Sequence, residues 1–220
     1  MARVQIPSVP IYFMAPKWGR ELAGGGGGTS VHVIMGPGAI ASSNYGSRPQ
    51  RNAPRCITAL RRDHPKVKWI AGHLLNDNMG GPGVSENLTP LTATTNKRHS
   101  AVELKVKELL IISNQFFNID KSEVEKAISR AVTEKDKRAE LAKLYVHAIE
   151  MKVIVSNTKM TMPVLDKKTG RTVDVDVNAP HAIQVHAKAI RYDCTEAGNW
   201  VRSKSRPDIT KAVRRVIRNE

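Results

Sequence analysis

The chain has 220 residues and a formal net charge of +15, so it is long enough to bury a sizeable core and should attract polyanions such as nucleic acid. Its two cysteines, Cys56 and Cys194, lie far apart without metal-ligand spacing, which excludes a disulfide framework. No apolar run approaches the roughly 18 residues of a transmembrane helix, and prolines interrupt the N-terminus too early for a signal peptide.

Residues 1–55 carry the signals of flexible structure, including early prolines and the run Gly24–Gly28. We predict that they form a flexible Gly/Pro-rich N-terminal arm and that residues 56–220 form the folded domain. The glycine run is either a linker or a phosphate-binding loop. The linker is favoured, because no Gly-Lys-Ser/Thr follows the glycines. Residues 29–35 (TSVHVIM) alternate like a short strand that could pair with the domain.

The middle of the chain predicts two strands followed by helices. Residues 67–75 and 87–92 are typical of strands, and a Gly-Gly-Pro-Gly turn at 80–83 lies between them. A helix follows, with apolar residues at helical spacing from Val102 to Leu110, which gives a core motif over 67–112. Asp120 and Glu123 form a capping box that predicts the start of a second helix, and a third is predicted over about 136–150.

Beyond Met151 the period changes from helical to alternating. This pattern predicts strands over 151–160, 171–177 and 181–192, with a turn at 167–170 between the first two. A short basic helix over about 207–218, begun near Pro207, is predicted to close the domain. The order of elements indicates an α+β fold with a C-terminal antiparallel β-rich section.

Polar residues gather around the two middle strands. His73 lies on the first strand, where a hydrogen-bonded core histidine is the simplest interpretation. Asn96, His99 and Glu103 follow the second strand. Asn96 and Glu103 are seven residues apart, so they share one helical face if the helix begins this early. Alternatively, Ser100 and Glu103 form a capping box and Asn96 lies in the loop, and the two interpretations are compatible if Asn96 sits just ahead of the first turn.

The segments AGHLLNDNMGGPG and ENLTPLTATTNKRHSAVE, within residues 69–110, resemble the DNA/RNA non-specific endonuclease family of the ββα-metal (His-Me finger) superfamily, as found in bacterial toxin and effector nuclease domains. The resemblance covers about a fifth of the chain. It implies a ββα-metal nuclease core with additional helices, in which His73 after Gly72 is the general base. It also implies that Asn96, after the Thr-Pro pair at 89–90, holds the metal, and that Glu103 supports the site.

Two features depart from the family. Ile70-Ala71 stands where many members have Asp-Arg, so another cation must steady the phosphate, from the set Arg61, Arg62, Lys68, Lys97 and Arg98. Glu103 is also one residue nearer to Asn96 than the family implies. As substrate-binding residues we predict three that lie near the site and two in the basic C-terminal segment: Lys97, Arg98, His99, Arg214 and Arg215.

These observations predict a metal-dependent endonuclease that hydrolyses DNA and RNA with little sequence preference, using Mg²⁺ or another divalent cation. The resemblance further implies a bacterial toxin or effector, made in the cytoplasm without a signal peptide and exported by a specialised secretion system. Its expected partners are nucleic acid, an acidic immunity protein and a secretion-apparatus carrier, with no membrane. The alternative is a non-catalytic nucleic-acid-binding or structural protein that retains a ββα scaffold.

Overall fold

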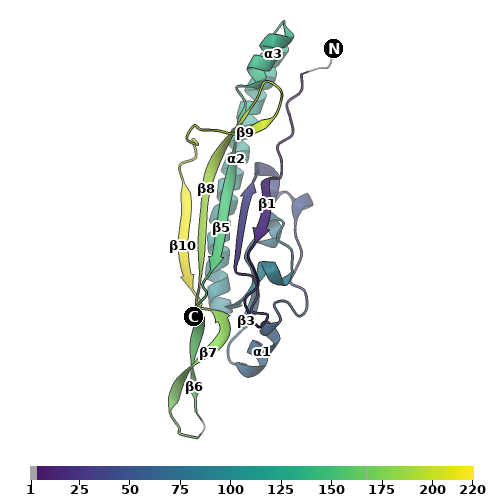
Figure 1. The fold of residues 1–220 in the computed structure, drawn as a ribbon. Helices are drawn as coiled ribbons and strands as arrows, with labels where there is room; N and C mark the ends of the chain where they lie inside the picture. The colour runs from purple at the N-terminus through teal and green to yellow at the C-terminus, as the bar shows by residue number, and fades with distance from the viewer. Residues whose placement is uncertain (1–3, 167) are drawn as a thin grey trace.

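A computed structural model describes residues 4–166 and 168–220 (Figure 1). In this part of the chain a six-stranded antiparallel sheet runs in the order β1 (Tyr12–Trp18), β2 (Ser30–Met35), β5 (Tyr145–Val155), β8 (Ala182–Cys194) and β10 (Ala212–Arg218), with β9 (Trp200–Arg202) paired to β8. Two hairpins lie outside it: β3 (Trp69–His73) with β4 (Leu88–Thr92), and β6 (Lys159–Leu165) with β7 (Thr172–Pro180). The predicted α+β fold class is confirmed.

Three α-helices accompany these strands: α1 (Cys56–Asp63), α2 (Ala93–Arg130) and α3 (Glu134–Leu141). Short 3₁₀ turns occur at η1 (Pro37–Ile40), η2 (Ser42–Asn44), η3 (Asp77–Met79) and η4 (Ser85–Asn87). Across the described residues, no helix combines the length and the apolar character that crossing a membrane requires.

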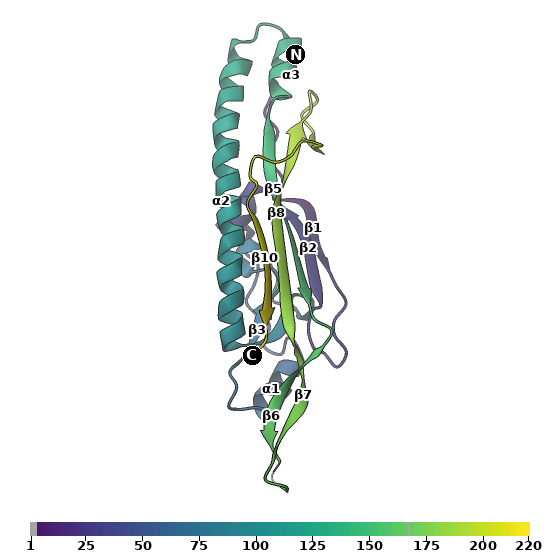
Figure 2. The same ribbon diagram turned by 90° about the vertical axis from the view of Figure 1, so that its left-hand side faces the viewer.

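Helix α2 lies along one face of the main sheet, and the core is the layer between them (Figure 2). Side chains alternate along each strand, so every second residue points at the helix. Residues of this kind include Val33, Met151 and Val185, which pack in one cluster with Val106 and Leu109 of α2. The loop that follows β3 adds its own leucines to the same cluster. The β3–β4 hairpin is thereby fixed on the helix side of the sheet.

The helical region differs from the prediction of three separate helices. A single 38-residue helix, α2, continues through the capping-box residues Asp120 and Glu123, and the residues predicted to form the third helix divide between α3 and the start of β5. Residues 93–130 contain no glycine or proline, so no residue ends the helix ahead of the predicted capping box. The predicted start at Asp120 is therefore wrong.

The C-terminal segment is a strand where a basic helix is predicted. Val213, Val216 and Ile217 have helical spacing, but all three are β-branched, and β10 pairs with β8 from Ala212 to Arg218. Val213 and Ile217 are buried, whereas Val216 is 62% exposed on the other face. Edge pairing thus decides the conformation of this segment.

In the β6–β7 connection, Lys167 of the predicted 167–170 turn lies outside the described residues.

The segment predicted as a flexible N-terminal arm, residues 1–55, contributes β1 and β2 to the main sheet, and residues 29–35 pair with β5 as their alternation indicates. Part of the glycine run is buried against β4. The Gly28 N–H donates to Leu88 O at 2.7 Å, and a Cβ on Gly28 would lie 1.9 Å from Glu86 O. Only glycine fits such an approach. The run is an ordered turn, and its interpretation as a linker is wrong.

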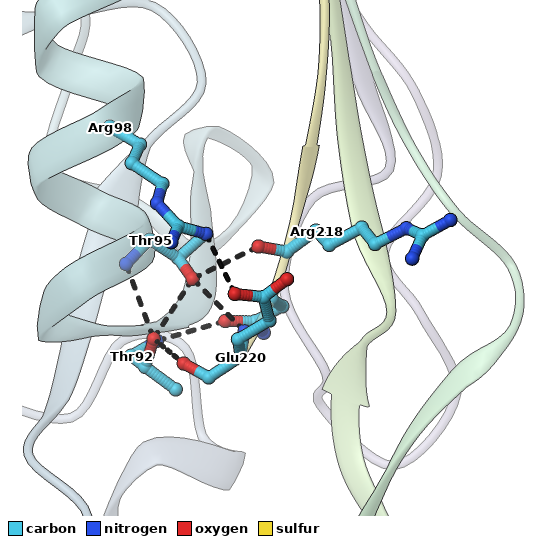
Figure 3. Close-up of polar contacts among 6 residues, drawn as sticks. Thr92, Thr95, Arg98, Arg218 and Glu220 are labelled. Carbon is cyan, nitrogen blue, oxygen red and sulfur yellow. Dashed lines mark hydrogen bonds and ion pairs between the residues drawn. The ribbon is translucent and has the colours of Figure 1, made fainter.

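Residues 219–220, which we call the C-terminal clamp, bind the start of α2, and Figure 3 shows Glu220 against Thr92 and Thr95. The side chain of buried Asn219 accepts the Thr92 N–H at 3.0 Å and donates to Pro90 O and Pro180 O at 3.2 and 2.9 Å. The Glu220 N–H donates to Thr95 Oγ1 at 3.2 Å. The clamp therefore joins the β4–α2 junction to β10, the strand that the clamp directly follows.

Candidate active site

The β3–β4 hairpin leads directly into α2. The strands pair antiparallel, with Gly72 opposite Thr89 and His73 opposite Leu88. Thr92 caps the helix, because its side-chain oxygen accepts the Thr95 N–H at 3.2 Å. Asn96 consequently lies in the first turn of α2 and shares a face with Glu103, as the first of the two interpretations predicts. The capping box at Ser100 is wrong, since the helix has already begun.

Gly72 allows the helix to approach the strand. A Cβ placed on this residue would lie 2.9 Å from Asn96 Oδ1 and 2.5 Å from Leu91 Cδ1, both too close for a side chain. The absence of a Cβ lets the amide oxygen of Asn96 sit against the backbone of β3, one residue before His73. Packing therefore explains the glycine of the Gly-His pair, because it makes room for Asn96 of α2.

His73 ends β3, partly exposed, and its ring is oriented by the loop that follows β2. Its Nε2 lies 3.0 Å from Ser47 O. A carbonyl oxygen only accepts hydrogen bonds, so in the neutral ring Nε2 carries the hydrogen and Nδ1 keeps its lone pair. Ser47 is itself held in place, since its Oγ accepts the Gly83 N–H at 2.8 Å. The geometry assigns Nδ1 as the basic nitrogen.

Glu103 reaches the site from the second turn beyond Asn96. It is 4% exposed, and Asn76 donates Nδ2–H to its Oε2 at 2.9 Å. Asn76 is fixed in turn, because its Oδ1 accepts the Asn78 N–H at 3.0 Å. The other oxygen, Oε1, has no hydrogen-bond partner among the described residues. Burial raises the pKa of Glu103 to about 7, so near neutral pH the protonated and ionised forms are both populated.

His99 lies beside Glu103 and is only 1% exposed. Its Nδ1 is 3.8 Å from Glu103 Oε1, too far for a hydrogen bond, and its Nε2 lacks a partner within the described part of the chain. Burial, with a smaller contribution from His73, lowers the pKa of His99 to about 4. The ring is therefore neutral at pH 7, and no ion pair forms with Glu103.

The other predicted substrate-binding residues lie apart from this cluster. Lys97 is exposed, and Arg98 Nη1 pairs with Glu220 Oε2 at 2.8 Å. Arg98 and Arg215 line a groove between α2 and β10, on the opposite side of α2 from Asn96. Arg214 points to the face of the sheet away from α2. The structure thus brings together His73, Asn96, His99 and Glu103 and separates them from Arg98, Arg214 and Arg215.

Among the cations considered to replace the missing arginine, Arg61 and Arg62 are engaged in other contacts, as Arg98 is. Arg61 donates its Nη2–H to Trp69 O at 3.1 Å, at the start of β3, and Arg62 pairs with Asp63 at 2.7 Å. Lys107 is near enough to Glu103 for its charge to lower the pKa of that carboxyl. Lys107 is a candidate that sequence reasoning missed, and helical spacing from Glu103 was the available signal.

Two further contributors were missed, namely Asn76 as the partner of Glu103 and Ser47 as the partner of His73. The turn position of Asn76 has an ordinary backbone explanation, and Ser47 acts through its carbonyl group, which every residue possesses. Neither role has a signal in one sequence, because both depend on how the loops at 44–50 and 76–83 pack against each other.

The cluster suits a hard divalent cation. Asn96 Oδ1 is a neutral oxygen ligand, and the unpartnered Oε1 of Glu103 is a second oxygen on the same face of α2. Within residues 4–166 and 168–220, no three His, Cys, Asp or Glu side chains gather as a metal site. Mg²⁺ commonly binds through one or two protein oxygens and several waters, so the residues present fit it.

Comparison of the chain with models of protein families, with curated proteins and with solved structures finds no match. The function is therefore argued from the geometry and chemistry of this cluster.

Proposed function

We propose that the chain is a metal-dependent endonuclease, built on a ββα-metal core, that hydrolyses phosphodiester bonds of DNA and RNA with little sequence preference. The observation that supports this proposal is the convergence of His73, Asn96 and Glu103 at the junction of β3, β4 and α2. His73 ends β3, Asn96 and Glu103 share one face of α2, and Gly72 has no side chain where Asn96 approaches β3.

In the proposed mechanism His73 is the general base. Its Nε2–H is held by Ser47 O, so Nδ1 can take the proton from a water molecule that attacks the phosphorus in line. A neutral imidazole is suited to this task at neutral pH. The hydrogen bond to Ser47 O also stabilises the imidazolium ion that forms, because its carbonyl dipole faces the positive ring.

Asn96 Oδ1 would hold the cation, and Glu103 Oε1, on the same face of α2, would orient a bound water. Bound Mg²⁺ would neutralise the negative charge on the phosphate oxygens and on the departing 3′ oxygen. The amide of Asn96 is a suitable ligand because it binds a hard ion without cancelling its charge. Asn76 keeps the Glu103 carboxyl in one orientation. His99 is neutral and adds no positive charge that would repel the cation.

Nucleic acid of any sequence would be attracted by the excess of cations, since phosphate contacts carry no sequence information. A basic nuclease of this type would act as a bacterial toxin or effector. An acidic immunity protein would capture it rapidly through complementary charge. Export by a secretion-apparatus carrier belongs to the same proposal and rests on the family resemblance.

Cleavage of plasmid DNA and of RNA, with Mg²⁺ or with EDTA, tests the proposal. We expect cleavage only with metal, and we expect His73→Ala to reduce the rate by a factor on the order of 10² to 10⁴, the usual contribution of a general base. The matched control is His181→Ala, at an exposed histidine whose side chain makes no hydrogen bond within the described residues.

Equal cleavage by His73→Ala and by wild type would remove His73 from the mechanism. Tight binding of nucleic acid by the folded wild type, with no cleavage at any metal concentration, would instead favour the non-catalytic alternative.

A further inference from the structure

The face of the main sheet turned away from α2 carries a straight row of basic side chains. Lys17 of β1 pairs with His32 of β2, His32 with Lys152 of β5, Lys152 with His186 of β8, and His186 with Arg214 of β10. Directly paired residues on neighbouring strands point to the same face. These five residues, which we call the basic row, therefore cross five strands over a length of ~19 Å.

The orientation of the basic row follows from the core. Neighbours of its members along the strands, Val33, Met151 and Val185, are buried under α2, so the basic row points the other way. Figure 2 shows α2 on one side of β5, β8 and β10, and across the described residues no helix covers the other side. Lys152 has 50% of its side chain exposed, and both end members, Lys17 and Arg214, are exposed as well.

One carboxylate, Glu150, lies next to the basic row and is already matched by cations. Its Oε1 is 2.8 Å from His32 Nε2, and its Oε2 is 3.5 Å from Lys188 Nζ. The side chain of Glu150 is 12% exposed, whereas that of Lys188 is 63% exposed. An approaching ligand therefore contacts the exposed cations before it reaches the less exposed carboxylate of Glu150.

Apolar side chains run beside the basic row. Ile154 pairs with Gln184, and Gln184 pairs with Val216, on the same face and one step along the strands. Ile154 is 46% exposed and Val216 is 62% exposed. A surface pocket of about 390 Å³ includes Lys152, Ile154, His186 and Arg214 in its wall. Ile154 and Val216, with Gln184 between them, therefore form a row parallel to the basic row.

We propose that this face binds single-stranded nucleic acid, with phosphates along the basic row and bases against Ile154 and Val216. A single strand presents both phosphates and open base faces, whereas a duplex offers such a stripe only its backbone. The cores of protein interfaces are depleted of Lys, so a row centred on Lys152 fits a polyanion better than a protein partner. The face lies opposite the candidate active site, so binding there goes beyond cleavage and does not require it.

Binding measured in EDTA tests this surface without cleavage. The probes are a labelled oligothymidylate and a labelled duplex of equal length. The face variant is Lys17→Gln with Lys152→Gln and Arg214→Gln. Its control removes three exposed cations at the tip of α2 and α3, by Arg130→Gln, Lys135→Gln and Arg138→Gln. Both variants lower the net charge by the same amount, so they differ only in where the charge is removed.

For the face variant we expect single-strand affinity to fall on the order of tenfold at 0.15 M salt. The slope of log affinity against log salt should fall by up to about 2, at about 0.7 for each phosphate that the protein no longer neutralises. The control variant should change both much less. Ile154→Thr with Val216→Thr keeps β-branched residues in the strands and should weaken single-strand binding without changing the slope.

Equal losses in the face and control variants would overturn the proposal, because they would mean a general charge effect. Duplex binding as tight as single-strand binding, with the same loss, would assign the face to duplex. Displacement of the oligonucleotide by polyglutamate at a lower charge concentration than by unlabelled oligothymidylate would assign it to an acidic protein. Melting temperatures within a few degrees of wild type establish that each variant is folded.

Discussion

Glu103 is a carboxyl group that the fold holds partly protonated. Its pKa rises from an ordinary 4.5 to about 7, which means that the folded state favours the neutral form. The stability that this preference contributes is fully present below pH 4.5 and is lost as the pH rises through 7. At pH 8 the ionised, buried carboxylate costs about 3 kcal/mol relative to its neutral form.

Glu103→Gln should therefore stabilise the metal-free protein at pH 8, by up to about 3 kcal/mol, and change its stability little at pH 4. The glutamine oxygen can still accept from Asn76, and its amide can donate toward His99 Nδ1. Urea unfolding in EDTA at the two pH values measures the difference. Cleavage with Mg²⁺ should fall at the same time. A variant less stable than wild type at pH 8 would contradict the assignment of an unpartnered buried carboxylate.

Gly72→Ala should disturb Asn96 more than it disturbs the fold. The new Cβ would press on Asn96 Oδ1 and Leu91 Cδ1, and overpacking of this kind costs about 1–3 kcal/mol. We expect the Mg²⁺ concentration for half-maximal cleavage to rise, because the displaced amide is the proposed ligand. The control is Gly38→Ala, where a Cβ meets nothing within 4 Å. A metal-dependence curve that overlays that of wild type would separate Asn96 from the metal.

The positions of His73 on a strand and of Asn96 and Glu103 on one face of the following helix could be predicted from the sequence, because the local geometry of a strand–strand–helix unit determines them. Asn76 and Ser47 could not, because their contacts depend on loops that are far apart in the chain. The substrate-binding prediction for Arg214 and Arg215 rested on charge alone. Charge does not say which face of a strand a residue occupies.

At the scale of elements, the same limit explains why the C-terminal strand is predicted as a helix. The spacing of Val213, Val216 and Ile217 fits a helix locally, but the edge of β8 offers seven residue pairs from Ala212 to Arg218. In α2 the local caps fail for a different reason, because residues 93–130 contain no glycine or proline that would end the helix ahead of them. Long-range pairing decided only the C-terminal case, and one sequence contains no direct signal of it.

The C-terminal clamp gives a prediction at this scale. Asn219 is 3% exposed and makes three hydrogen bonds to the β4–α2 junction and to Pro180. Asn219→Ala leaves buried backbone groups unpaired, at about 1–3 kcal/mol for each group that stays unsatisfied. We expect a loss of about 2–4 kcal/mol in urea unfolding, on the same basis. Asn157→Ala, at an exposed position in a turn, is the matched control and should change little.

Cleavage by folded Asn219→Ala should also fall, since Thr92 caps the helix that carries Asn96. Full activity together with full stability would show that the junction holds without the clamp.

At the scale of the whole molecule, the sheet separates the two proposed functional surfaces. The candidate active site lies on the side of α2, and the basic row lies on the other. A net charge of +15 attracts nucleic acid to both surfaces, so the total charge does not show which surface binds it more tightly. Variants at single faces, read by their salt slopes, distinguish them where measurements on the whole protein do not.

The clamp also bears on the order in which the molecule forms. Thr92 and Asn219 are bonded although 127 residues separate them, and contacts of such long sequence separation close slowly because the intervening chain must first be ordered. The β3–β4 hairpin and the start of α2 are local and can form early. The first turn of α2, with Asn96 on it, is locked only when β10 has docked on β8. Folding kinetics followed at a probe near Asn96 should therefore report the slowest phase of the molecule.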